Sequence, residues 1–175
     1  MKNAKEMKEH KGMRPQDIVI LLKIAIYQGR PWLMKDIAYD LYISASEVSE
    51  SINRSMMAGF IASDKKRLMK QALLEFLQHG IKYVFPQRPG AVARGVATAY
   101  SATPLVEQLQ SEEPIVWSYA EGNIRGQTIE PLYPSVPKAC LKDPKLYEVL
   151  ALVEALRIGR IREQILAIEE LKKRI

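Results

Sequence analysis

The chain has 175 residues, 47% of them hydrophobic, and its 26 basic and 20 acidic side chains give a formal net charge of +6. This length and apolar content predict one domain or two small ones with a packed core, and they exclude wholesale disorder. The single cysteine excludes an internal disulfide framework and any zinc site built from several cysteines. The positive charge is compatible with an anionic partner, although a charge of this size also serves solubility.

Membrane insertion is not expected from the hydropathy pattern. No stretch reaches the ~18 apolar residues that a membrane span needs, and the longest candidate, residues 18–27, is interrupted by Lys23. The first residues are basic but lack the apolar stretch of a signal peptide behind them. We therefore expect a cytoplasmic protein without a membrane partner.

The elements predicted in the first third of the chain are helices. Residues 1–14 are basic without apolar periodicity, so we expect a solvated tail. Pro15 suits the first turn of a helix, and apolar residues then recur at helical spacing over residues 18–26. A second helix fits residues 34–41. A third begins at the capping-box sequence Ser44-Ala45-Ser46-Glu47 and is expected to reach about residue 58.

The middle of the chain has a mixed pattern. Helical periodicity returns over residues 64–79, and the alternation in residues 81–85 is typical of a short strand. Eight of the ten prolines lie in residues 86–144, which excludes long helices there. Short strands are predicted at 115–119 and 127–130.

The C-terminal segment, residues 145–175, is helical in pattern, as one helix or as two separated at Gly159. Ile161, Ile168 and Ile175 recur every seven residues, which favours self-association of an exposed terminal helix. The alternative is a helix packed against the N-terminal domain of its own chain. We expect a homodimer formed through these helices.

A family resemblance rests on the segment between Leu33 and Ile61. Residues 36–41, 42–44 and 47–52, followed by Ala-Gly-Phe-Ile at 58–61, resemble a winged helix-turn-helix, most closely that of MarR-like bacterial transcriptional regulators. The resemblance covers about the first half of the chain. It implies a mainly α fold with short β-strands, in which a winged helix-turn-helix domain precedes C-terminal helices. Tyr42 stands where such turns usually carry glycine, which raises the question of a positive φ.

This interpretation divides the chain into four segments. They are a basic flexible tail (1–14), the helix-turn-helix domain (15–85), proline-rich loops and short strands (86–144), and a helical dimerisation segment (145–175).

The resemblance implies transcriptional regulation by binding of double-stranded DNA, with the second helix of the pair in the major groove. Serine and asparagine bond base edges or phosphates, arginine pairs with phosphate or guanine, and glutamate accepts from cytosine N4. The candidate groove contacts are Ser46, Ser49, Glu50, Asn53 and Arg54, and the candidate phosphate contacts are Lys65, Lys66, Arg88 and Arg94.

The charge of the predicted DNA-binding unit is unusual for its expected partner. Residues 34–58 contain two basic and four acidic side chains, whereas residues 64–94 contain seven basic and two acidic ones. A helical pattern follows Ile61, so no conventional basic wing is evident. The loop 87–95 is either a substitute that contacts phosphates or a solvated loop with turn glycines. The flanking segments are therefore expected to supply the phosphate contacts.

Catalysis, cofactors and metals are not expected. Residues 90–95 have the glycine spacing of a P-loop without its Lys-Ser/Thr, so a nucleotide cradle is not indicated. His10 and His79 have no neighbouring partner in the sequence for a metal site or a triad, and Cys140 suits a small buried apolar position. The alternative function is a non-enzymatic protein-interaction module on the same fold, such as an adaptor or an antitoxin-like partner.

Overall fold

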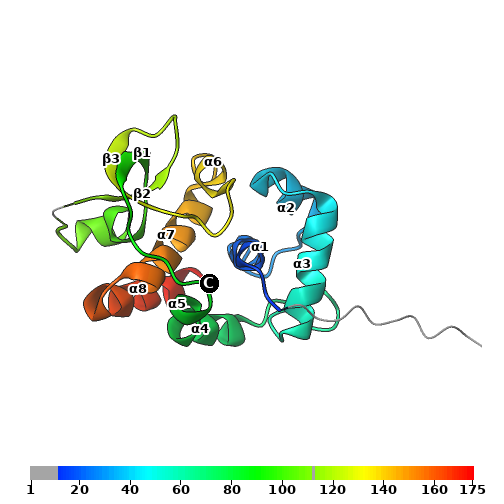
Figure 1. Ribbon diagram of the computed structural model, residues 1–175. Coiled ribbons are helices and arrows are strands. Elements are labelled where there is room, and N and C mark those ends of the chain that lie inside the picture. Colours follow the sequence, from blue (N-terminus) through cyan, green and yellow to red (C-terminus); the bar gives the residue numbers. More distant parts are fainter. Residues whose placement is uncertain (1–11, 112) are drawn as a thin grey trace, which may run out of the picture.

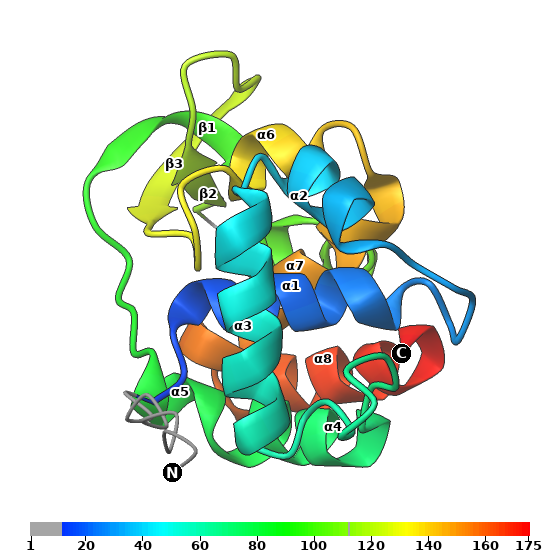
Figure 2. The ribbon, with the colours of Figure 1, turned by 90° about the vertical axis from the view of Figure 1, so that its right-hand side faces the viewer.

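The computed structural model describes residues 12–111 and 113–175, and this part of the chain is mainly helical, with eight α-helices and a small three-stranded mixed sheet (Figure 1). Two helices form its centre. Helix α7 (Pro144–Ile158) has ten buried residues among its fifteen, and helix α1 (Pro15–Ala25) has nine among its eleven. Figure 2 shows α1 crossing between α3 and α7. Both helices are mainly apolar because most of their residues are covered, and each also buries two charged side chains, Asp17 and Lys23 in α1 and Glu154 and Arg157 in α7.

The three N-terminal helices form where the sequence predicts them. Helix α1 begins at Pro15, α2 spans Met34–Leu41 and α3 spans Ala45–Met57. Helices α2 and α3 pack on each other, and α3 also packs on α1. Of the predicted basic tail, residues 1–11 lie outside the described residues.

The segment after α3 differs from the prediction. Helix α4 (Lys70–His79) begins six residues later than expected, because residues 61–68 form a short hairpin closed by an antiparallel bridge between Ile61 and Leu68. At its tip, the Asp64 carboxylate accepts the N–H groups of two following residues, a local bonding pattern that competes with helix formation. The strand predicted at 81–85 is also wrong: helix α5 (Ile81–Val84) occupies this position, and of its apolar residues only Ile81 is buried.

The sheet consists of β1 (Val92–Ala97), β2 (Ile115–Ser118) and β3 (Ile124–Ile129). Strand β1 pairs antiparallel with both other strands, while β2 and β3 pair parallel to each other. The strand predicted at 115–119 is confirmed, and the one predicted at 127–130 overlaps β3. Strand β1 begins within the segment 87–95, for which the sequence predicts a loop. Glycine is needed at position 95 for close packing of the strands and not for a turn, because a Cβ there would lie 2.0 Å from the carbonyl oxygen of Trp117.

Short helical segments connect the sheet to the helical body. The 3-10 helices η1 (Ala99–Ser101) and η2 (Leu105–Glu107) follow β1, and helix α6 (Val136–Cys140) leads into α7. Helix α6 packs against α2. The Ser135 hydroxyl before α6 donates to the carbonyl oxygen of Leu41, the last residue of α2, at 2.5 Å. The start of α6 is therefore held beside the end of α2.

Gly159 separates α7 from α8 (Ile161–Arg174), so the C-terminal segment contains two helices. Helix α8 packs on α7 and α4, and its residues Ile168 and Leu171 are buried within the chain. Ile161 and Ile165 are exposed, by 76% and 52%. The seven-residue apolar repeat is thus divided between the chain's own core and its surface. None of the described helices is long and apolar enough to cross a lipid bilayer.

Candidate nucleic-acid interface

Three residues join α2 to α3, and each has a distinct role. Tyr42 adopts the left-handed conformation, with φ 55° and ψ 39°, which costs a non-glycine residue roughly 1–2 kcal/mol. Ile43 is buried in the core. Ser44 is the N-cap of α3, and its hydroxyl accepts the N–H of Glu47 at 3.2 Å. The turn therefore places the N-terminus of α3 at the surface, as the capping sequence predicts.

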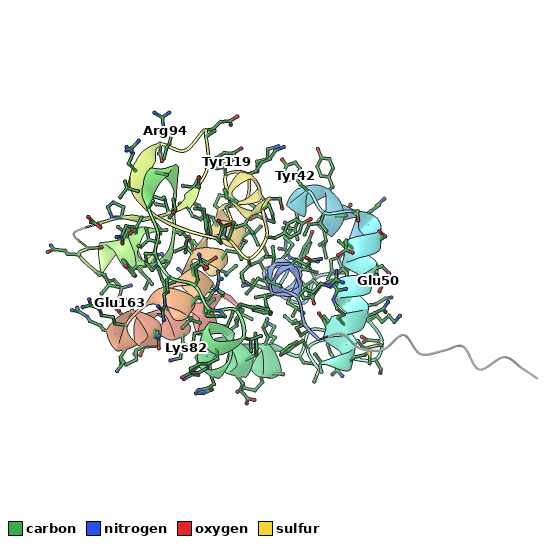
Figure 3. All side chains as sticks on the ribbon, in the orientation of Figure 1. Tyr42, Glu50, Lys82, Arg94, Tyr119 and Glu163 are labelled. Atoms are coloured by element: carbon green, nitrogen blue, oxygen red, sulfur yellow. The ribbon has the colours of Figure 1, made fainter. Side chains whose placement is uncertain are left out.

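The outward side of α3 carries the residues expected in the groove. Ser46 and Glu50 are exposed, and Ser49 and Asn53 are partly exposed; Figure 3 labels Glu50 on this outer side. The Lys65 ammonium, from the hairpin tip, donates to the Asn53 side-chain oxygen at 2.8 Å. The structure thus brings together two predicted contacts that lie twelve residues apart in the sequence.

Arg54 forms an ion pair within its own chain. Its guanidinium donates twice to the Asp17 carboxylate, from Nε to Oδ2 at 2.9 Å and from Nη2 to Oδ1 at 2.7 Å. Asp17 is fully buried, and this bidentate contact is the largest of the causes that raise the pKa of Arg54. We therefore assign Arg54 to the attachment of α3 to α1 and leave it out of the candidate interface.

Two of the four acidic side chains of the α2–α3 pair contact cations of another element. The Glu47 carboxylate accepts a hydrogen bond from Gln16 and lies 3.7 Å from the guanidinium of Arg14. It turns toward α1 and does not complete the predicted capping box. Asp40 pairs with the buried ammonium of Lys23 at 2.8 Å. These pairs do not remove the acidic excess, because Lys23 also pairs with Asp143 and Arg54 is held by Asp17.

The hairpin at 61–68 supplies positive charge directly beside α3. Lys65 and Lys66 are both exposed at its tip. Asp64 lies next to them, and the backbone N–H groups that it accepts, from Arg67 first and then from Lys66, lower the pKa of its carboxyl group. The signals for this hairpin are the aspartate at its tip and the two apolar residues, Ile61 and Leu68, that close it.

Arg94 does not join this surface. Arg94 is exposed on β1, opposite Arg125 of β3 in the sheet register. Figure 3 shows Arg94 on the sheet, on the other side of the molecule from Glu50. Arg88 lies in the loop between α5 and β1. Arg94 therefore belongs to a different face from α3, so this end of the segment 87–95 is not a wing beside the helix.

One group of residues at the α2–α3 turn has no counterpart in the sequence prediction. The ammonium groups of Lys138 and Lys142 lie 4.1 Å and 5.1 Å from the ring centroid of Tyr42. Among the described residues, neither lysine forms an ion pair with a carboxylate. We call Tyr42, Lys138 and Lys142 the tyrosine–lysine cluster. The residues are almost one hundred positions apart, so no local pattern reveals the contact.

Comparison with protein-family models, with curated proteins and with solved structures finds no match to this chain. Among the described residues there is also no group of three or more histidine, cysteine, aspartate or glutamate side chains placed to hold a metal ion. The features that bear on function are therefore the surface of α3, the hairpin and the tyrosine–lysine cluster.

Proposed function

We propose that this chain binds double-stranded DNA and regulates transcription, with α2 and α3 as a helix-turn-helix and the hairpin at 61–68 as a short wing. The observation that carries the proposal is the hydrogen bond between Lys65 and Asn53. It makes one continuous surface from the polar side of α3 and the basic tip of the hairpin. A helix that presents short polar side chains beside lysines suits a major groove flanked by phosphates.

The composition of this surface supports the same interpretation. Ser46, Ser49 and Asn53 offer hydrogen-bond donors and acceptors to base edges, and Glu50 offers an acceptor to cytosine N4. Lys65 and Lys66 offer charge to the backbone, where most of the affinity for DNA arises. Glu47 lies against Arg14 and Asp40 against Lys23, so neither carboxylate meets a polyanion without a cation beside it.

The experiment measures the affinity for duplex DNA as a function of salt. Fluorescence anisotropy with a labelled pool of random duplexes is expected to show binding that weakens as salt rises from roughly 50 to 200 mM. The variant Lys65→Gln/Lys66→Gln is expected to bind more weakly and to flatten the salt dependence. Arg94→Gln/Arg125→Gln, which removes the same charge from the sheet, is the matched control and should bind as the unmodified chain does. Absence of binding at the lowest salt would refute the proposal.

We also propose that the regulator is a homodimer formed through α8, because two copies of α3 can then reach successive major grooves. Ile161 and Ile165 are four residues apart and exposed on one side of this helix. Sedimentation equilibrium is expected to show a dimer that Ile161→Lys/Ile165→Lys converts to a monomer. Val84→Lys, at another exposed apolar position, serves as the control. A monomeric unmodified chain would contradict this part of the proposal.

A protein-interaction module is the second candidate, and one observation favours it. Large apolar side chains are exposed around the same two helices: Leu33 by 55%, Tyr39 by 83% and Met57 by 56%. Exposed apolar groups gathered on one face are typical of protein-binding surfaces. Co-purification of a stoichiometric protein partner in the absence of DNA would favour this alternative. The partner should be lost when Tyr39→Ser is purified in the same way.

A further inference from the structure

Tyr42 holds a backbone conformation that is unfavourable for its residue type. Only glycine adopts a φ of 55° without strain, and any residue with a side chain loses stability there. Strain of this kind persists where the surrounding structure holds the residue for another reason. The ring is 38% exposed, so burial of apolar surface is an incomplete reason. What the ring does contact is the pair of lysine ammonium groups.

The two lysines are placed there by the packing of α6 on α2. The hydrogen bond from Ser135 to the Leu41 carbonyl fixes the start of α6 beside the turn, and Lys138 and Lys142 follow at a spacing of four residues. Both side chains are exposed. The pKa of the Lys142 ammonium is raised, first by a hydrogen bond with Tyr42, and the nearby Tyr39 and Tyr119 hydroxyls act in the same direction. Two positive charges thus lie side by side with aromatic rings around them.

The chemistry of the cluster indicates which part of a nucleic acid it would contact. Base stacking requires an open ring face. Lys138 lies only 4.1 Å from the centroid of Tyr42, so a base cannot stack freely on this ring. Two ammonium groups and a phenolic hydroxyl are instead hydrogen-bond donors for the oxygens of a phosphodiester. A phosphate also relieves the repulsion between the two lysines, which no carboxylate among the described residues does.

The cluster and the hairpin lysines lie toward opposite ends of α3. Tyr42 lies three residues before Ala45, where α3 begins, while Lys65 contacts Asn53 toward the other end of the helix. The thirteen residues of α3 span about 20 Å. Positive charge therefore flanks α3 at both ends, as a helix lying in a groove between two phosphate backbones requires. Figure 3 shows Tyr42 and Tyr119 on the side of the molecule where α6 lies.

We propose that the tyrosine–lysine cluster is a phosphate-binding site for the backbone of duplex DNA at the N-terminal end of α3. This inference rests on the proposed function, because it assigns the second backbone contact of the same interface. The hairpin lysines hold one strand of the duplex, and the cluster holds the other.

The test is the salt dependence of duplex binding in Lys138→Gln/Lys142→Gln. Loss of two phosphate contacts is expected to lower the affinity by about tenfold and to reduce the slope of log K against log salt by about 1 to 2. Arg94→Gln/Arg125→Gln is again the charge-matched control. Thermal denaturation is expected to show that each variant remains folded, since all four side chains are exposed.

Tyr42 provides a second variant whose folding is favoured. Tyr42→Gly relieves the positive φ, so it is expected to fold, and yet to bind duplex DNA more weakly because the ring that positions the ammonium groups is gone. Tyr42→Phe keeps the ring and should lose less affinity than Tyr42→Gly. Equal affinity in Tyr42→Gly, Tyr42→Phe and the unmodified chain would overturn the inference.

The outcomes separate this inference from the proposed function. If the unmodified chain binds no DNA, both fall. If the Lys65 and Lys66 variant weakens binding while the cluster variant does not, the proposed function stands and the inference is overturned. If the cluster variant loses binding to a single-stranded oligonucleotide but keeps its affinity for the duplex, the assignment to the duplex backbone is likewise overturned.

Discussion

The bidentate contact between Arg54 and Asp17 gives the most stringent test of how α3 is held. Asp17 is fully buried in the unmodified chain, and Arg54→Ala leaves its carboxylate with the N–H of Arg14, at 2.8 Å, as the remaining donor among the described residues. Two charge-assisted hydrogen bonds are lost, each worth about 1.5–3 kcal/mol. Breaking a buried ion pair on one side costs about 3–5 kcal/mol by comparison with measured cases. We therefore expect Arg54→Ala to lower the free energy of unfolding by about 3–5 kcal/mol and the melting temperature by roughly 10 °C.

The assay is chemical denaturation of the single variants Arg54→Ala and Asp17→Asn and of the double variant Asp17→Asn/Arg54→Met. The double variant removes both charges and keeps most of the volume, so it should recover a large part of the lost stability. DNA binding of the double variant is measured under conditions in which denaturation shows this variant to be folded. If Arg54→Ala unfolds within about 1 kcal/mol of the unmodified chain and loses DNA binding, Arg54 acts on DNA and the structural assignment is wrong.

Three other predictions concern buried groups. Burial lowers the pKa of Lys23, but its hydrogen bonds to two aspartates outweigh this and raise the pKa above its ordinary value of 10.5. The stabilisation by Lys23 is therefore complete below that pH and is lost as the pH rises through the folded-state pKa. Lys23→Met should cost about 2 kcal/mol in neutral solution and should flatten the fall in stability that denaturation measures at alkaline pH. Gly95→Ala, which forces a Cβ against the carbonyl of Trp117, should cost about 3 kcal/mol, whereas Gly90→Ala, with its Cβ 3.4 Å from the nearest atom, should melt nearly as the unmodified chain does. Burial raises the pKa of the Cys140 thiol, so a thiol reagent should modify it only at the rate at which the chain unfolds, and rapid modification of the folded protein would contradict its placement in the core.

Local signals predicted the N-terminal helices well. The bounds of α2 are those expected, and α1 and α3 begin where Pro15 and Ser44 indicate. Capping residues and helical periodicity act within a few positions along the chain, so one sequence is enough to read them. The orientation of Ser46 and Asn53 toward the surface follows from the same periodicity.

Elements that depend on distant residues were missed. Strand β1 exists because Gly95 permits close approach to β2, some twenty residues later, and the hairpin at 61–68 depends on a single bridge and one aspartate. The site was affected in the same way. The partner of Arg54 is 37 positions away, and the lysines beside Tyr42 come from a helix that only tertiary packing brings near. A count of charged residues along the sequence therefore did not show which of them are paired within the chain and which face solvent.

The burial of α1 on all sides has a consequence for any attempt to study the N-terminal helices alone. One side of α1 is covered by α3 and another by α7, which lies more than one hundred residues further along the chain. A fragment ending at residue 85 would expose the side that α7 covers, a row of isoleucine, valine and leucine in water. The candidate interface is thus held in shape by the C-terminal half of the protein. A ligand or partner that loosens α7 would alter the seating of α3 without touching it.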